Sequence, residues 1–444
     1  MDVNRLDTLS ATEAAQAIHA GSISSVQLVE ACLARIRDME PKVQAWQFLD
    51  EAHALAQARM RDADRAEGRA TGALHGVPVG IKDIIDTADM PTEDGTVLHA
   101  GRTPDRDATV VAMLRAAGAV IMGKTVTTEC ATLSPGKTRN PHNLERTPGG
   151  SSSGSAAAVA SGMVPLAIGT QTNGSVIRPA SFCGVYGFKP THGLVPRHGI
   201  LKLSRTLDTV GVFARTLEDI ALIAEQIIGY DERDPDTRPR AKPALQRTLN
   251  EEPPFAPRLA FIKTPMWSRA EASTGEAFAE LTQSLGAQCE ARELPTALND
   301  AWDWMRTIQE AEMAPYLDLE WERGRESLST PLREQLTRGR AILALDHQKA
   351  VARIAPMIAG FDELFENFDA IVTPSAPGEA PPAATTGDPV FCSLWSMCGM
   401  PALNLPLMSG PAGLPLGVQL VGKRGFDARR LRTARWLARH VQHA

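Results

Sequence analysis

The sequence predicts an α/β protein with a largely parallel central sheet. From about residue 72 onward, short apolar runs such as 119–122, 164–168 and 185–188 alternate with helical patterns and glycine-rich turns. Strands that alternate with helices are typical of sheets whose parallel strands are joined by crossover helices. Of the 444 residues, 43% are hydrophobic and 22% are charged, which is the composition of an ordinary globular protein with a large core.

Residues 1–70 are predicted to form N-terminal helices. Ser10 and Glu13 have the spacing of a capping box, and Ser24 and Gln27 repeat that spacing. In such a box the serine side chain and the residue three positions later each satisfy a backbone amide of the first turn. Two helix starts are therefore expected in this segment.

The second half of the chain is expected to belong to the same sheet-centred body. Residues 231–257 are polar and rich in proline, which predicts a long surface loop and the best candidate boundary. Three apolar runs predict further strands: 258–262, 370–374 and 417–421. The helical segment 268–367 is expected to pack over the sheet, so residues 1–444 are predicted to form a single domain.

Charge and cysteine content exclude several classes of protein. The net charge of −6 gives no electrostatic reason to expect nucleic acid or an anionic membrane as a partner. The six cysteines are scattered without a CxxC pair, so reduced thiols are expected. The start of the chain has no signal-peptide pattern, and no apolar run approaches the length of a membrane helix. These features predict a cytoplasmic protein.

Two serine-glycine loops and one lysine indicate the chemistry. The loops are residues 149–155 and 169–175, and the lysine is Lys82. A serine needs a base before it can attack a carbonyl, and no His or Asp motif near either loop offers one. A buried lysine can act as that base because desolvation lowers its pKa and leaves the amine neutral. The pattern therefore predicts an amide-bond hydrolase that uses no metal and no cofactor.

The surroundings of the two loops support this prediction. The first loop precedes the helix-forming run 156–160, which places its backbone amides at a helix N-terminus. The second loop follows an apolar strand, so Ser175 is expected on a turn at the edge of the sheet. Glycines in this second loop allow backbone amides to approach a substrate oxygen closely.

Five motifs in a fixed order resemble those of the amidase signature family. They are Gly-Val-Pro-Val-Gly-Ile-Lys-Asp at 76–83, Gly-Lys-Thr at 123–125, the serine-glycine segment 146–158, Gly-Thr-Gln-Thr-Asn-Gly-Ser-Val-Ile-Arg-Pro at 169–179, and Gly-Phe-Lys-Pro-Thr at 187–191. Members of this family hydrolyse C–N bonds with a Ser–cis-Ser–Lys triad. The resemblance implies a mixed, largely parallel sheet surrounded by helices. It also implies a catalytic core over 72–215 and a variable helical region over 268–367 that covers the site.

The resemblance also assigns roles by position. Ser175 is the expected nucleophile, Ser151 the bridging serine and Lys82 the base, and the bond between Gly150 and Ser151 is expected to be cis. The expected oxyanion hole consists of the backbone amides of Thr172, Asn173, Gly174 and Ser175. No metal ion and no cofactor belong to this mechanism.

Two positions depart from the usual family pattern. The chain has Gln171 and Asn173 where many members have Asp-x-Gly-Gly-Ser, so the Asn173 side chain must be accommodated. Gln171 is a candidate substrate-binding residue, and bracing the loop is its alternative role. Arg178 lies three residues beyond Ser175, where an arginine of malonamidase-like members binds a substrate carboxylate. The alternative for Arg178 is an ion pair with a structural carboxylate.

Other motifs in the sequence do not indicate a function. Residues 118–125 fit the P-loop pattern, but the run 119–122 favours a strand where a phosphate-binding loop must turn. The ten histidines show no metal-ligand spacing such as HExxH. Cys130 and Cys183 lie close to the catalytic motifs, yet they are expected to be small buried hydrophobic residues.

Two functions follow as hypotheses. The first is an amidase acting on a small to medium amide, with aryl amides, anilides and carbamates (a urethanase activity) as candidate substrates. Several apolar residues in the variable segments favour a substrate with an aromatic or alkyl acyl group. They are Met305, Ile308, Met313, Tyr316, Trp395 and Met397. The alternative is an ammonia-generating, glutaminase-type subunit of a transamidation complex. A homodimer is a candidate assembly of the protein.

Overall fold

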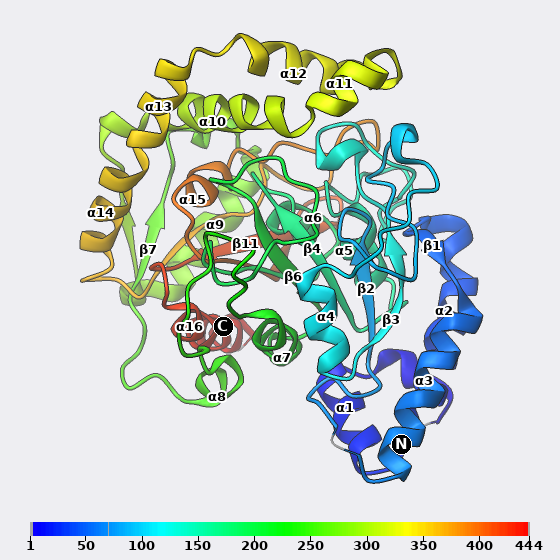
Figure 1. Cartoon of the computed structure of the whole chain (residues 1–444). Coiled ribbons are helices and arrows are strands. Elements are labelled where there is room, and N and C mark those ends of the chain that lie inside the picture. Colours follow the sequence, from blue (N-terminus) through cyan, green and yellow to red (C-terminus); the bar gives the residue numbers. More distant parts are fainter. Residues whose placement is uncertain (1–2, 70, 443–444) are drawn as a thin grey trace.

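The computed structural model describes residues 3–69 and 71–442, and these form one eleven-stranded sheet with helices around it (Figure 1). The strands are β1 (Trp46–Leu49), β2 (Pro78–Lys82), β3 (Val120–Thr125), β4 (Leu166–Gln171), β5 (Tyr186–Lys189), β6 (Thr209–Ala214), β7 (Leu259–Ile262), β8 (Cys289–Arg292), β9 (Ala370–Pro374), β10 (Ala402–Ser409) and β11 (Pro415–Val421). Their order across the sheet is β1-β3-β2-β4-β6-β5-β10-β11-β9-β7-β8. The α/β class predicted from the sequence, with a mixed sheet, is confirmed.

Parallel pairing occurs in two groups of strands. β2 lies between β3 and β4 and is parallel to both, and β7 lies between β8 and β9 and is parallel to both. The neighbours between these groups are antiparallel, as is the edge pair of β1 with β3. The first parallel group includes β2, which ends at Lys82, and β4, which leads into the second serine-glycine loop.

Helices cover the sheet and extend beyond it. They are α1 (Ala11–His19), α2 (Ser25–Val43), α3 (Glu51–Ala66), α4 (Thr109–Ala116), α5 (Ser153–Ala160), α6 (Ile177–Phe182), α7 (Leu217–Ile227), α8 (Leu245–Asn250), α9 (Ala272–Leu285), α10 (Ala301–Tyr316), α11 (Asp318–Gly324), α12 (Thr330–Ala341), α13 (Ala344–Ala352), α14 (Ile354–Leu364), α15 (Ser393–Met397) and α16 (Asp427–Gln442). Both predicted capping boxes are present, at Ser10 with Glu13 and at Ser24 with Gln27. In Figure 1, α10, α11 and α12 form a separate layer at the top of the view, and α15 lies between α10 and the sheet.

One segment predicted as a loop contains a helix. Residues 231–257 include α8, which was missed because only six residues are helical between proline-rich stretches. Leu245 and Leu249, one helical turn apart, are both fully buried where α8 packs against α7 and α16. An apolar pair four residues apart is the signal that indicates such a short amphipathic helix.

The P-loop pattern does not form a phosphate-binding loop. Gly123, Lys124 and Thr125 lie inside β3, all buried, as the strand preference of the preceding residues predicts. The Lys124 amine donates hydrogen bonds to the backbone carbonyl of Ile85 (2.8 Å) and to that of Pro91 (3.2 Å). This lysine therefore ties the segment after β2 to the sheet.

In the part of the chain that the structure describes, no helix combines the length and apolar character needed to cross a membrane.

Candidate active site

The sheet brings the lysine and the two serine-glycine loops to one place. Lys82 is the last residue of β2, and Gln171 is the last residue of the parallel neighbour β4. Since parallel strands end at the same edge of a sheet, Lys82 and the turn after Gln171 lie side by side. Ser151 lies two residues before Ser153, where α5 starts. Three segments distant in sequence therefore converge at this edge.

Lys82 and Ser151 are in direct contact. The Lys82 Nζ lies 2.7 Å from the Ser151 Oγ and 2.9 Å from the Thr170 Oγ1, all within hydrogen-bonding distance. Lys82 is fully buried and Ser151 is 1% exposed. The peptide bond between Gly150 and Ser151 is cis, as the family resemblance implies. The base and the bridging serine of the expected relay are thus placed for proton transfer.

Burial changes the acidity of the Lys82 amine. Desolvation lowers the pKa of Lys82 from 10.5 to about 7, and the nearby Asp208 carboxylate opposes this shift. A lysine with an ordinary pKa is almost entirely protonated at neutral pH and cannot accept a proton. Lys82 is instead divided between its charged and neutral forms near pH 7, which suits a general base.

Ser175 lies on the turn that connects β4 to α6, and its side chain is 9% exposed. Across the described residues, no acceptor is bonded to the backbone N–H groups of residues 172–175. Four such donors on one turn can bind a developing oxyanion. Gly174 is needed for close packing, because a Cβ added there would lie 2.8 Å from the Cβ of Pro389.

The helix α15 holds this turn from the other side. The Ser393 hydroxyl donates to the side-chain oxygen of Asn173 (2.8 Å), and the Ser396 hydroxyl donates to the backbone carbonyl of Asn173. The bond from Ser393 accommodates the Asn173 side chain that departs from the usual family pattern, and the bond from Ser396 fixes the backbone of the turn. No sequence motif connects residue 173 with residues 393–396, and these bracing residues were missed.

Gln171 is engaged entirely within the loop and with α15. Its side-chain oxygen accepts hydrogen bonds from the backbone N–H groups of Val176 (2.8 Å) and Ile177 (3.0 Å), and its amide donates to the Ser396 hydroxyl (2.9 Å). The oxygen thereby accepts hydrogen bonds from two backbone N–H groups at the start of α6 that have no partner within the helix. These contacts favour the bracing role of Gln171 over substrate binding.

Arg178 contacts the cis peptide. Its Nη2 donates to the backbone carbonyl of Gly150 (2.7 Å) and to the Thr386 hydroxyl (3.4 Å). The side chain is 2% exposed, and within the described residues it has no carboxylate partner, so the structural ion pair considered above is not formed. Burial lowers the pKa of Arg178 to about 10, and its Nε and Nη1 are left without partners. Arg178 therefore supports the loop that carries Ser151, and its Nε and Nη1 groups remain available as hydrogen-bond donors.

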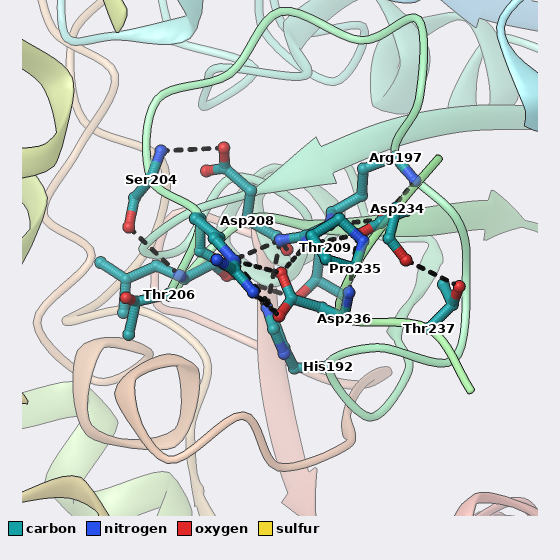
Figure 2. A network of polar contacts seen from close by, with 12 residues as sticks. His192, Arg197, Ser204, Thr206, Asp208, Thr209, Asp234, Pro235, Asp236 and Thr237 are labelled. Carbon is teal, nitrogen blue, oxygen red and sulfur yellow. Dashed lines mark hydrogen bonds and ion pairs between the residues drawn. The ribbon is translucent and has the colours of Figure 1, made fainter. Parts of the chain in front are cut away.

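A cavity adjoins the buried lysine. Thr170, which is bonded to Lys82, lines it together with Thr172 and Asp208, and much of the remaining wall comes from the segments 197–205 and 233–236 and from Tyr316. Ser151 and Ser175 are not among the residues that line this cavity. Figure 2 shows the polar network of this wall, in which Arg197 joins Asp234 and Asp236 while the backbone N–H of Ser204 donates to Asp208. No sequence motif indicates this wall, because its ion pairs link segments that share no pattern.

Two other classes of site receive no support. Across the residues that the structure describes, no group of three or more His, Cys, Asp or Glu side chains could hold a metal ion. Cys130 and Cys183 are buried, and burial raises the pKa of both thiols, so neither is an activated nucleophile.

The fold and the site together define a class of protein: an α/β enzyme fold with a buried lysine–serine pair beside a serine-glycine turn. The model of the amidase family matches residues 27–431. A glutamyl-tRNA(Gln) amidotransferase subunit of Symbiobacterium thermophilum is 37% identical over 96% of this chain and 95% of its own length. The corresponding protein of Roseiflexus castenholzii is 37% identical over 94% and 93%. This chain belongs to the amidase signature family.

Solved structures agree with this assignment. The peptide amidase of Stenotrophomonas maltophilia is 31% identical, with a TM-score of 0.85 over 98% of this chain and 97% of its own. A 6-aminohexanoate cyclic dimer hydrolase solved with its substrate is 25% identical, with a TM-score of 0.87 over 98% of both chains. A structure described as a vestigial protein complex related to an s-triazine catabolic enzyme is 26% identical, with a TM-score of 0.90 over 97% and 98%.

Gln171→Leu should destabilise the protein while keeping its fold. The substitution leaves the buried N–H groups of Val176 and Ile177 without an acceptor, which we expect to lower the free energy of unfolding by about 2 kcal/mol. Chemical denaturation followed by circular dichroism measures this loss. In the matched control Gln47→Leu, an exposed glutamine is replaced, and the change should stay within about 0.5 kcal/mol. Equal stability of the two variants would contradict the bracing role.

Proposed function

We propose that this protein hydrolyses the C–N bond of a carboxamide through an acyl-enzyme on Ser175. The observation that carries the proposal is the 2.7 Å contact between the buried Lys82 amine and Ser151 beside the turn that bears Ser175. Neutral Lys82 takes the proton of Ser151, and Ser151 takes the proton of Ser175 as the Ser175 oxygen attacks the substrate carbonyl.

The remaining steps use the same groups. The free backbone amides of residues 172–175 stabilise the oxyanion of the tetrahedral intermediate. Protonated Lys82 returns the proton through Ser151 to the leaving nitrogen, and the C–N bond breaks to give an acyl-Ser175 ester. Water then attacks this ester while the relay accepts its proton, which releases the acid and restores Ser175.

The relatives favour one class of substrate over another. The 37% identity to an amidotransferase subunit extends over 96% of this chain and supports the ammonia-generating, glutaminase-type subunit of a transamidation complex. Within this proposal, glutamine is the amide donor, partner proteins receive the ammonia, and the protein works in the cytoplasm.

A self-sufficient amidase is the second candidate. The peptide amidase and the cyclic dimer hydrolase, whose folds this chain shares, support it. Its substrates would be small to medium amides, including aryl amides, anilides and carbamates. The apolar side chains expected to favour an aromatic group give little support, because Met305, Ile308 and Trp395 belong to a buried core cluster.

Ser175→Ala should abolish turnover and leave the fold intact. Without the hydroxyl no acyl-enzyme can form, so we expect the rate on any accepted amide to fall by at least about 1000-fold. Circular dichroism and the thermal midpoint should match those of the wild type, because the substitution removes one oxygen atom from a turn that Gln171 and α15 brace. Retained activity in this variant would place the nucleophile elsewhere.

The rate should rise with pH through about pH 7 and level off above it. Lys82 has a pKa lowered to about 7, so it is protonated and inactive as a base below this pH and neutral above it. A pH profile of kcat/KM measures the midpoint, and Lys82→Ala should be nearly inactive at every pH. The control Lys349→Ala removes an exposed lysine and should keep the wild-type profile. A wild-type rate for Lys82→Ala at neutral pH would eliminate the lysine base.

A hydrolysis panel distinguishes the two substrate classes. Purified protein is incubated with glutamine, malonamate, benzamide, an anilide and an aryl carbamate, each beside the Ser175→Ala control. We expect ammonia from glutamine, raised by added partner proteins, if the protein is a transamidation subunit. Turnover of the aryl substrates alone would overturn that candidate in favour of the self-sufficient amidase. Preference for malonamate would place the free donors of Arg178 on a substrate carboxylate.

A further inference from the structure

Asp208 is bonded to the turn that bears Ser175. Its Oδ1 accepts a hydrogen bond from the Thr172 hydroxyl (2.7 Å), and its Oδ2 accepts from the backbone N–H groups of Leu203 (2.8 Å) and Ser204 (2.9 Å). Asp208 thus joins the turn after β4 to the segment that forms the cavity wall. Figure 2 shows its bond to Ser204 of that segment. No sequence motif assigned a role to this carboxylate.

Lys82 and Asp208 are hydrogen-bonded to two threonines, Thr170 in β4 and Thr172 just beyond its end. The Lys82 Nζ contacts the Thr170 hydroxyl at 2.9 Å, and the Thr172 hydroxyl contacts Asp208 at 2.7 Å. Side chains two residues apart in an extended chain point to the same side and are roughly 7 Å apart. Thr170, Thr172 and Asp208 also line the same cavity. The carboxylate therefore lies close to the amine without touching it.

The arginines of the cavity wall are paired with other carboxylates. Arg197 forms ion pairs with Asp234 (2.9 Å) and Asp236, and Arg205 pairs with Asp236 (3.0 Å). Arg197 reaches Asp208 only at its backbone carbonyl (3.1 Å). The other charged or titratable groups on the wall are His198, Lys202, Arg233 and Tyr316, and Arg233 pairs with Asp231. Among the described residues Asp208 forms no ion pair, and the donors bonded to its carboxylate are neutral. Burial raises the pKa of Asp208, while these hydrogen bonds and the charge of Arg197 oppose the rise and favour the carboxylate.

We propose that Asp208 is a positioning residue for the candidate reaction: it anchors the Ser175 turn through Thr172 and supplies the negative charge that faces Lys82. This inference rests on the proposed function. The negative charge stabilises the ammonium form that Lys82 adopts after it has taken the proton of Ser151. It also opposes the effect of burial on the pKa of Lys82. Burial alone would lower that pKa more and make the amine a weaker base.

Asp208→Asn tests the charge, and a sulfonyl fluoride provides a readout that needs no known substrate. Phenylmethanesulfonyl fluoride transfers its sulfonyl group to an activated serine oxygen and releases fluoride, while the relay takes the serine proton. The rate of labelling of Ser175, followed by intact mass from pH 5 to pH 10, therefore reports the protonation of Lys82. Loss of a charge at this distance should move the midpoint to lower pH by on the order of one pH unit.

Two further variants separate anchoring from charge. Thr172→Val removes the hydroxyl at nearly constant shape, so the plateau rate should fall about tenfold with the midpoint unchanged. Asp219→Asn is the matched control, because Asp219 also accepts bonds from two backbone N–H groups, of Ala11 and Thr12, and from the Thr12 hydroxyl. Asp219 lies on α7 and should leave both midpoint and plateau at the wild-type values.

The outcomes distinguish this inference from the proposed function. An unchanged or raised midpoint for folded Asp208→Asn would overturn the charge role, and a wild-type plateau for Thr172→Val would overturn the anchoring role even if Asp208→Asn does not fold. Labelling of Ser175→Ala at the wild-type rate would instead refute the nucleophile, and with it the proposed function. A shifted midpoint for Asp208→Asn together with an unshifted one for Asp219→Asn is the expected result.

Discussion

The removal of water from the Lys82 amine is the constraint on which the rest of the site depends. An isolated charged amine is expensive to bury, and a group in this position lowers its pKa to avoid that cost. The sheet provides the dry environment because Lys82 ends a strand flanked on both sides by β3 and β4. The polar groups bonded to the amine are the hydroxyls of Ser151 and Thr170, which can exchange protons or hydrogen bonds without adding charge.

Much of the fold follows from local sequence. The capping boxes at Ser10 and Ser24, the strand over Val120–Thr125 and the helix after the first serine-glycine loop all depend on contacts within a few residues. The convergence of Lys82 with Ser151 also follows, because long motifs in a fixed order resemble one family. The helix α8 did not follow from local sequence, because its six residues are stabilised by packing against α7 and α16.

The supports of the site could not be predicted in the same way. Asn173 depends on Ser393 and Ser396, more than 200 positions away, and Asp208 is bonded to a turn 36 positions earlier. Serine and aspartate at these spacings carry no signal, because they are also common on solvated surfaces. Only the paths of the strands bring them together. The sequence therefore indicated the groups that we propose to react, while the groups that hold them required the structure.

This separation bears on how one chemistry can serve different substrates. The Ser175 turn is braced by Gln171 and by α15, whereas the cavity wall is held by its own ion pairs between Arg197 and two aspartates. Changes in the wall can therefore alter what fits next to Thr170 and Thr172 without moving Ser175. Asp208 is where the two parts meet, because it is bonded both to the turn and to the wall. A substitution that reshapes the wall but keeps this carboxylate leaves the hydrogen bonds that hold the Ser175 turn in place.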